Sequence, residues 1–206
     1  MYNPQHFQEH HPAEIARLVD FNPLAALVAM TPAGLVANHI PLLREGEGFV
    51  GHVALANDLH RDVPDGAPVL AIFQAGDAYV SPNWYPSKAE THRAVPTWNY
   101  RVVHVQATIH WSHADRDKRR AVSLLTTHHE RAVNGAAGWR MGDAPADYMA
   151  GMLEKIVAFR LTVTRTEAKV KLNQNRTPED IAAVADAYEK GGRTTLAQAM
   201  RQRGDG

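Results

Sequence analysis

The stretch YRVVHVQATIHWSH, residues 100–113, alternates apolar and polar side chains with a period of two. Successive side chains of an extended strand point to opposite faces, so this alternation predicts one long strand with a buried face and a polar face. The predicted buried face carries Val103, Val105, Ala107, Ile109 and Trp111. No other part of the chain gives so clear a secondary-structure signal.

Further strands are predicted on both sides of this one. The apolar runs LAALVAM, GLVANHIPLL and GFVGHVAL, within residues 24–55, are separated by turn residues and predict an antiparallel meander. Residues 68–82 predict another strand with a kink or tight turn at 75–77, and residues 156–172 return to alternation as the last strand.

Helices are predicted over residues 11–23, 114–133, 144–156 and 177–190. The last of these has a well-marked start, with Thr177 as N-cap, Pro178 at the first helical position and Asp180 at the third. Strands predominate, and helices lie at both ends and after the long strand. The economical prediction is one barrel-like α+β domain, mostly antiparallel, with peripheral helices.

The composition excludes several classes of function. The 206 residues contain no cysteine, which excludes disulfides, thiolate zinc sites and iron–sulfur clusters and is typical of a reducing cytoplasm. The 12 histidines are scattered without a metal-binding spacing, so no metal is expected. We find no signal peptide, no apolar run long enough to span a membrane, and no Rossmann, P-loop or hydrolase motif.

The segment SPNWYPSKAETHRAVPTWNY, residues 81–100, combines large rings and prolines with almost no aliphatic residues. One interpretation is a rigid loop whose rings cap the open end of a barrel. The other is a site for a flat ligand, in which rings lie beside the ligand, polar groups contact its edge and cations bind a phosphate. The residues concerned are Ser81, Trp84, Tyr85, Lys88, Arg93, Thr97, Trp98, Asn99 and Tyr100.

Three other polar interruptions are candidates for binding or for structure. Asn38 and His39 stand inside an apolar strand, and His52 and Asn57 repeat the pattern after Gly51. Polar groups inside a strand must find partners or face a cavity. The turn KLNQNR offers Lys171, Gln174, Asn175 and Arg176 either as a solvated turn or as donors for an anion or a flavin edge.

Nucleic-acid binding has weak support. Lys+Arg and Asp+Glu are equal at 22 each, so the chain has no overall field that would attract DNA. The basic run DRDKRR, residues 115–120, is best explained as a solvated helix start. The helical pieces around Gly191 and Gly192 are only superficially like a helix-turn-helix, because their connection is loose.

Taken together, the motifs MYNPQHF, ANHIPLL, GHVALAN, YVSPNWYPSK, VPTWNY and KLNQNR resemble the PaiB-type family in order and spacing, from Met1 to about Ala185. Members are named FMN-binding negative transcriptional regulators and are related to pyridoxamine-phosphate-oxidase-like flavin binders. The resemblance implies a six-stranded split β-barrel with peripheral helices, and a homodimer with FMN where two barrels meet. This chain has Asn173 where the motif usually has serine, which exchanges a hydroxyl for an amide.

The resemblance also implies which residues bind FMN. Carried over motif by motif, the candidates are Asn38, His39, His52, Asn57, Ser81, Trp84, Lys88, Thr97, Trp98, Asn99, Lys171, Gln174 and Arg176. We expect residues 1–188 to form the FMN-binding domain with its N-terminal helix, and residues 189–206 to be a helical extension of that domain.

Three functions are consistent with these observations. The first is an FMN-binding homodimer that represses transcription. The second is an FMN-dependent oxidoreductase or flavin reductase, in which the cofactor carries the chemistry and the protein supplies orientation and electrostatics. The third is a haem or other small-molecule binder on the same barrel, which the histidines keep open. Whether the chain is an enzyme is left undecided by the sequence.

Overall fold

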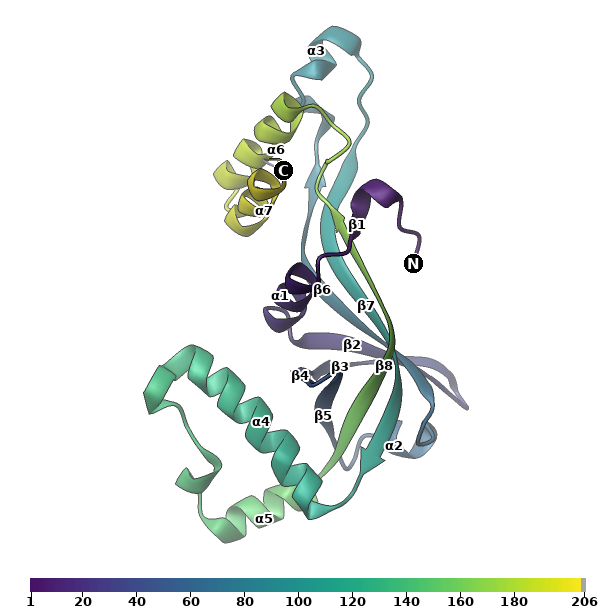
Figure 1. Cartoon of the computed structure of the whole chain (residues 1–206), viewed down its shortest axis with the longest axis vertical. Helices are drawn as coiled ribbons and strands as arrows, with labels where there is room; N and C mark the ends of the chain where they lie inside the picture. The colour runs from purple at the N-terminus through teal and green to yellow at the C-terminus, as the bar shows by residue number, and fades with distance from the viewer. Residues whose placement is uncertain (205–206) are drawn as a thin grey trace. The chain divides into compact units, whose positions relative to one another are not determined.

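The computed structural model describes residues 1–204. The chain separates into two compact units, the first with residues 1–21, 74–103 and those from 167 onward, and the second with residues 22–73 and 104–166. Three long strands, β6 (Pro68–Val80), β7 (Thr97–Ser112) and β8 (Ile156–Lys171), contribute residues to both units. Figure 1 labels these elements along the chain.

In the second unit the predicted strands are confirmed as β2 (Leu24–Thr31), β3 (Gly34–Pro41), the short β4 (Leu43–Glu45) and β5 (Gly48–Ala54). They do not form the predicted meander, because β3 and β5 are not neighbours in the strand order. β2 pairs antiparallel with β3 from Leu24–Pro41 to Thr31–Gly34, and β4 pairs antiparallel with β5. β2 also pairs with β6, and β5 with the first half of β8.

The described strands form one sheet of eight, in the order β3-β2-β6-β7-β8-β5-β4, with β1 (Gln8–Glu9) paired to β8. Two of them, β1 and β4, have only two and three residues, so six long strands carry the sheet. Every strand register that is defined is antiparallel, which confirms the predicted sheet type.

Helices of the second unit are α2 (Leu59–Asp62), α4 (Asp115–Asn134) and α5 (Ala146–Glu154), with single turns at Gly135–Ala137 and Met141–Asp143. α4 buries Ala121 in a cluster with Val50 of β5 and Ala158 of β8. Gly51 of β5 leaves room for its neighbours, because a Cβ there would lie 2.6 Å from the Phe159 ring. That glycine therefore serves packing within the sheet.

The first unit contains α1 (Pro12–Asp20), α3 (Ser87–Thr91), α6 (Pro178–Lys190) and α7 (Thr194–Gly204), with single turns at Gln5–Phe7 and Pro82–Trp84. α6 and α7 lie side by side in Figure 1 and contact each other extensively. The predicted N-cap is confirmed, since the Thr177 hydroxyl accepts a hydrogen bond from the Asp180 N–H at 3.3 Å. The boundary predicted between residues 188 and 189 stays a prediction.

The aromatic segment requires a correction. We predicted residues 81–100 as a loop, but Thr97 to Tyr100 belong to β7, which starts three residues earlier than the alternation indicated. The buried residues of this first part of β7 are Asn99 and Arg101, which are polar, so the hydrophobic pattern did not extend this far. The predicted kink in β6 is confirmed by Gly76, whose φ of 70° lies in the left-handed region.

Candidate functional site

Two half-exposed rings and a lysine gather on neighbouring strands of the first unit. Trp98 on β7 and Tyr79 on β6 are 51% and 44% exposed, and their rings meet edge to face with centroids 6.3 Å apart. Lys171, at the end of β8, donates from Nζ to the Thr97 hydroxyl and to the Trp98 carbonyl. The structure thus brings together three of the predicted residues, Thr97, Trp98 and Lys171, although the lysine is more than 70 residues away in sequence.

Electrostatics make this lysine unusual. Burial lowers the pKa of the Lys171 ammonium, and the nearby charge of Lys169 lowers it further. Both effects disfavour the charged form, and an anionic oxygen beside Nζ would offset them. Lys169 itself is buried and contacts aromatic rings, with Nζ 5.2 Å from the centroid of Tyr100 and 5.4 Å from that of Tyr2. This lysine–ring cluster could not be predicted from the sequence, because its members come from three separate segments.

Ser81, Trp84 and Lys88 lie in a second group, which is tied to α6. The Ser81 hydroxyl caps the Pro82–Trp84 turn by accepting from the Asn83 N–H at 3.2 Å, and Lys88 donates to the Asn83 side chain. Trp84 meets the ring of Tyr188 edge to face at 5.8 Å. These contacts are those of a folded, well-supported segment, and they leave Lys88 half-buried beside it.

Asn99 is fully buried. Its Nδ2 donates to Met200 Sδ on α7 at 3.5 Å, and its Oδ1 has no hydrogen-bond partner within residues 1–204. With Met200 in contact, the Asn99 amide is enclosed by protein. It does not face the same space as the exposed Trp98, because neighbouring residues of a strand point to opposite faces.

The KLNQNR turn is held mainly by its own side chains. Asn173 adopts a φ of 66°, a conformation that asparagine tolerates better than most residues, and its Nδ2 donates to the Tyr85 hydroxyl at 2.9 Å. Arg176 lies over the Tyr85 ring at 4.7 Å. The Gln174 amide accepts from the Leu172 N–H at 2.6 Å and donates to the Val170 carbonyl. The amide that replaces the usual serine hydroxyl therefore has a defined partner.

In the second unit, two predicted residues bind each other. Asn57 Nδ2 donates to Asn38 Oδ1 at 3.0 Å, and Asn57 Oδ1 accepts from the Leu59 N–H at 3.0 Å. The pair therefore links β3 to the turn that follows β5. His39, the next residue on β3, is exposed. Its strand is at the edge of the sheet.

His52 lines a cavity of the second unit together with His129 of α4. The cavity has a volume of about 400 Å³, and an adjoining one of about 300 Å³ shares His52 and Trp139 with it. His52 Nδ1 and His129 Nε2 are both buried without a hydrogen-bond partner among the described residues. Burial lowers the pKa of both imidazoles, with a further contribution from His128 at His129. Both shifts favour the neutral imidazole, the form that acts as a ligand or acceptor.

The predictions missed Arg101. It stands on β7 at an inward position, is 6% exposed, and donates from Nε to the Ala75 carbonyl at 3.0 Å. A signal for it was present in the sequence. Arg101 falls on the same face as Val103 and Val105, and a charged residue on the buried face of an alternating strand requires an explanation.

The donor set of the first unit fits a flavin. A flavin has a flat ring system with polar edges and a phosphate tail, and such ligands bind beside aromatic side chains with a few placed polar groups. The exposed rings of Trp98 and Tyr79 each offer a flat face, and Lys171 provides a cation at the Trp98 carbonyl. Within residues 1–204, no three His, Asp or Glu side chains are grouped as metal ligands would be. Across the same residues, no helix combines the length and apolarity needed to cross a membrane.

Comparison with known proteins points to the same cofactor. A family described as "Putative FMN-binding domain" matches residues 1–165. The chain is also 27% identical, over 193 residues, to the protease synthase and sporulation protein PAI 2 of Bacillus subtilis. That match covers 92% of this chain and 89% of the relative.

Solved structures share the fold. The FAD and heme binding protein of Mycobacterium smegmatis superposes with a TM-score of 0.61 at 22% identity, covering 85% of this chain and 79% of that protein. The flavocytochrome Anf3 of Azotobacter vinelandii superposes with a TM-score of 0.58 at 16% identity, covering 85% and 75%. The fold is thus the mostly antiparallel α+β split barrel that the sequence predicted. The match over residues 1–165 establishes that the chain belongs to the FMN-binding domain family, of the PaiB type, with FMN as its cofactor.

Proposed function

We propose that this protein is an FMN-binding homodimer that acts as a negative regulator of transcription. The observation that carries the proposal is the family match over residues 1–165, together with the similarity to PAI 2 along 92% of the chain. Members of the PaiB-type family are named as regulators of this kind. The two chains of the dimer would supply the paired sites that the family resemblance implies.

The flavin ring is proposed to lie against Trp98 and Tyr79, with Lys171 at its polar edge. The support is the exposure of both rings and the position of Lys171 Nζ between Thr97 and the Trp98 carbonyl. FMN supplies electron-transfer chemistry when bound, and these side chains would bind and orient it. An anionic edge oxygen would stabilise the charged form of Lys171, whose pKa burial has lowered.

Of the remaining candidates, Asn38, His39, His52 and Asn57 belong to the second unit, and Ser81, Trp84, Lys88, Asn99, Gln174 and Arg176 to the first. We keep them as proposed contacts of FMN in the dimer, except Asn99, whose amide is enclosed by protein. The Asn38–Asn57 pair supports this role indirectly, because the hydrogen bond between them uses only Oδ1 of Asn38 and leaves its Nδ2 able to donate.

The test is a titration of cofactor-stripped protein with FMN, followed by tryptophan quenching, with light scattering on the same samples. We expect saturation at one FMN per chain and a mass of about twice the 22.7 kDa of one chain. A stoichiometry well below one, or a mass of one chain at micromolar concentration, would contradict the FMN-binding homodimer.

The regulatory role has its own test. Filter binding or anisotropy with DNA from upstream of the protein's own gene should give a specific affinity at physiological salt that exceeds the affinity for scrambled DNA. Equal affinity for both DNAs would exclude repression by direct, sequence-specific DNA binding. Rapid reduction of the bound FMN by NADH or NADPH would instead favour the oxidoreductase, in which the cofactor does the chemistry.

A second candidate function is haem binding in the second unit. It is favoured by one observation, the unpartnered nitrogens of His52 and His129 at a single cavity within the described residues. The adjoining cavity is largely apolar, with Met149, Met152 and Leu153 in its lining. A neutral imidazole beside an apolar cavity is the arrangement that haem iron accepts as an axial ligand.

Haem titration tests this candidate independently of flavin. A sharpened Soret band at one haem per chain, lost in His52→Ala or His129→Ala and retained in the exposed-histidine variant His39→Ala, is the result expected for haem binding. An identical weak spectrum in all four proteins would eliminate it.

A further inference from the structure

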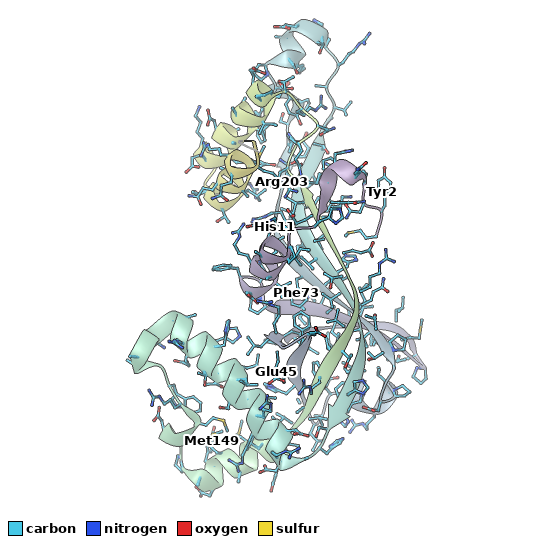
Figure 2. The ribbon with its side chains drawn as sticks, in the orientation of Figure 1. Tyr2, His11, Glu45, Phe73, Met149 and Arg203 are labelled. Carbon is cyan, nitrogen blue, oxygen red and sulfur yellow. The ribbon has the colours of Figure 1, made fainter. Side chains whose placement is uncertain are left out.

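The first unit contains a cavity of about 540 Å³. Of the residues predicted to bind FMN, only Gln174 lines it. Its lining comes from the chain before and within α1, from β7, from the end of β8 and the turn after it, and from α7. The lining residues are Glu9, His11, Glu14, Arg17, Leu18, Arg101, Val170, Leu172, Gln174, Ala199, Gln202 and Arg203. Figure 2 labels His11 and Arg203, which lie close together in this part of the molecule. The volume is within the range of small-molecule sites.

Two of the three arginines in this cavity are already compensated. Arg203 Nη1 lies 2.6 Å from Glu9 Oε2, and Arg17 Nη2 lies 2.9 Å from Glu14 Oε2. The Glu9 carboxylate also accepts from the His11 N–H at 2.8 Å. The charges balance within each pair, so both carboxylates that line the cavity already have an arginine partner.

Arg101 is the third arginine, and it has no ion pair within residues 1–204. Its one hydrogen bond there runs from Nε to the Ala75 carbonyl, which leaves Nη1 and Nη2 free of protein partners in the described chain. Burial lowers the pKa of the Arg101 guanidinium, the positive charge of Arg17 adds to this effect, and the negative charge of Glu14 opposes it in part. An arginine nonetheless stays charged in a protein, so the cavity holds one buried positive charge with no ion pair of its own among the described residues.

A buried charge without a counter-charge is costly, and the cost is offset when an anion with good geometry binds. The free edge of a guanidinium presents two parallel N–H donors, which match the two oxygens of a carboxylate or phosphate. The apolar lining from Leu18, Val170 and Leu172 would accept the uncharged part of such a molecule.

We propose that Arg101 anchors an oxyanion site in this cavity, which binds the carboxylate or phosphate group of a small molecule with a partly apolar body. One source of the oxyanion is the phosphate of an FMN whose ring lies on the other chain of the proposed dimer, because Trp98 and Arg101 point to opposite faces of β7. In that case the inference rests on the proposed flavin function and extends it to the cofactor's tail. The other source is a free organic acid or phosphate ester. That ligand would bind separately and make the protein responsive to a metabolite.

The experiment compares FMN with riboflavin, which lacks the phosphate, and adds inorganic phosphate and succinate as free oxyanions at constant ionic strength. Binding is followed by flavin fluorescence and by the unfolding temperature, Tm. The variants are Arg101→Gln and, as matched control on the same unit, Arg201→Gln. Arg201 is an exposed arginine paired with Asp186 and Glu189. Arg101→Lys keeps the positive charge and removes the two parallel N–H donors of the guanidinium.

If the oxyanion is the FMN phosphate, the wild-type protein and Arg201→Gln should prefer FMN over riboflavin by roughly 10-fold or more, and Arg101→Gln should lose this preference. If it is a separate molecule, FMN affinity should be equal in all variants. Phosphate or succinate should then raise the Tm saturably in the wild-type protein and in Arg201→Gln but not in Arg101→Gln. Arg101→Lys should fall between the two in either case, and it replaces Arg101→Gln if that variant does not fold.

The oxyanion site would be overturned if the wild-type protein neither preferred FMN over riboflavin nor gained Tm with phosphate or succinate. This outcome can be observed without any variant. Normal FMN binding in that experiment would leave the proposed function intact. Conversely, a saturable Tm response to phosphate in a protein that binds no flavin would support the oxyanion site and contradict the proposed function.

Discussion

The indole of Trp98 is 51% exposed although its strand neighbours Asn99 and Arg101 are buried. A tryptophan left exposed loses the hydrophobic stabilisation that burial would give, and a ligand that covers the ring would restore it. We expect Trp98→Ala to weaken FMN binding about tenfold, because stacking on an aromatic ring contributes on the order of 1 kcal/mol or more. Flavin fluorescence titration measures the effect.

The matched control is Trp139→Ala, which removes a comparably exposed tryptophan from the second unit. It should leave FMN affinity unchanged, and Trp98→Phe should retain most of it. A tenfold loss in Trp139→Ala with none in Trp98→Ala would show that the proposed flavin surface is on the wrong strand.

His52 makes stability depend on pH. Burial lowers its pKa from the ordinary value of 6.5, so the unfolded chain binds a proton at a higher pH than the folded chain does. Above about pH 6.5 the histidine is neutral in both states, and its stabilising contribution is fully present. As the pH falls below 6.5 toward the folded-state value, the free energy of unfolding should decrease.

Urea unfolding at pH 8, 7, 6 and 5 checks this expectation. His52→Gln should reduce the loss of stability between pH 7 and pH 5, whereas the control His39→Gln, at an exposed histidine of the same unit, should follow the wild-type curve. If His52→Gln keeps the wild-type pH dependence, the acid sensitivity comes from another group.

At the scale of elements, α3 is fastened to the N-terminus of α6 by one carboxylate. Asp180 is 1% exposed and accepts from the Ser87 hydroxyl at 2.7 Å and from the Ser87 N–H at 3.1 Å. Its negative charge at the third helical position also interacts favourably with the helix dipole. The start of α6 thus fixes the segment that carries Trp84 and Lys88.

Asp180→Ala should therefore lower the free energy of unfolding by about 2–3 kcal/mol, because it removes two hydrogen bonds to a buried charged group and leaves the Ser87 N–H without an acceptor. Denaturant titration provides the measurement. Asp186→Ala on the same helix removes only an exposed ion pair with Arg201 and should cost less than about 1 kcal/mol. Equal losses in the two variants would mean that the α3–α6 connection contributes little.

At the scale of the whole molecule, cofactor and fold should stabilise each other. A ligand that binds only the folded state adds about 2.7 kcal/mol to stability when its concentration is 100 times its dissociation constant. Removal of FMN should therefore lower the Tm by several degrees, and added FMN should restore it in calorimetry. An unchanged Tm at saturating FMN would indicate that the flavin binds without discriminating between folded and unfolded chain.

The sequence by itself determined the local structure and the family. The alternation in residues 100–113, the turn-separated runs of residues 24–55 and the Thr177 cap all specify backbone conformation through neighbours a few residues apart, so they could be read in order along the chain. The motifs from MYNPQHF to KLNQNR identified the split barrel and its cofactor in the same way, because each is a contiguous string of residues.

Only the tertiary structure decided which polar residues meet. Asn57 binds Asn38 from 19 residues away, and Lys171 reaches Thr97 from 74 residues away. It also decided that Arg101 would be buried with its guanidinium edge free beside α1 and α7. Such contacts depend on strand order and register, and these follow from the packing of the whole sheet and its helices. A period-two pattern assigns each residue to a face and leaves its partner undetermined.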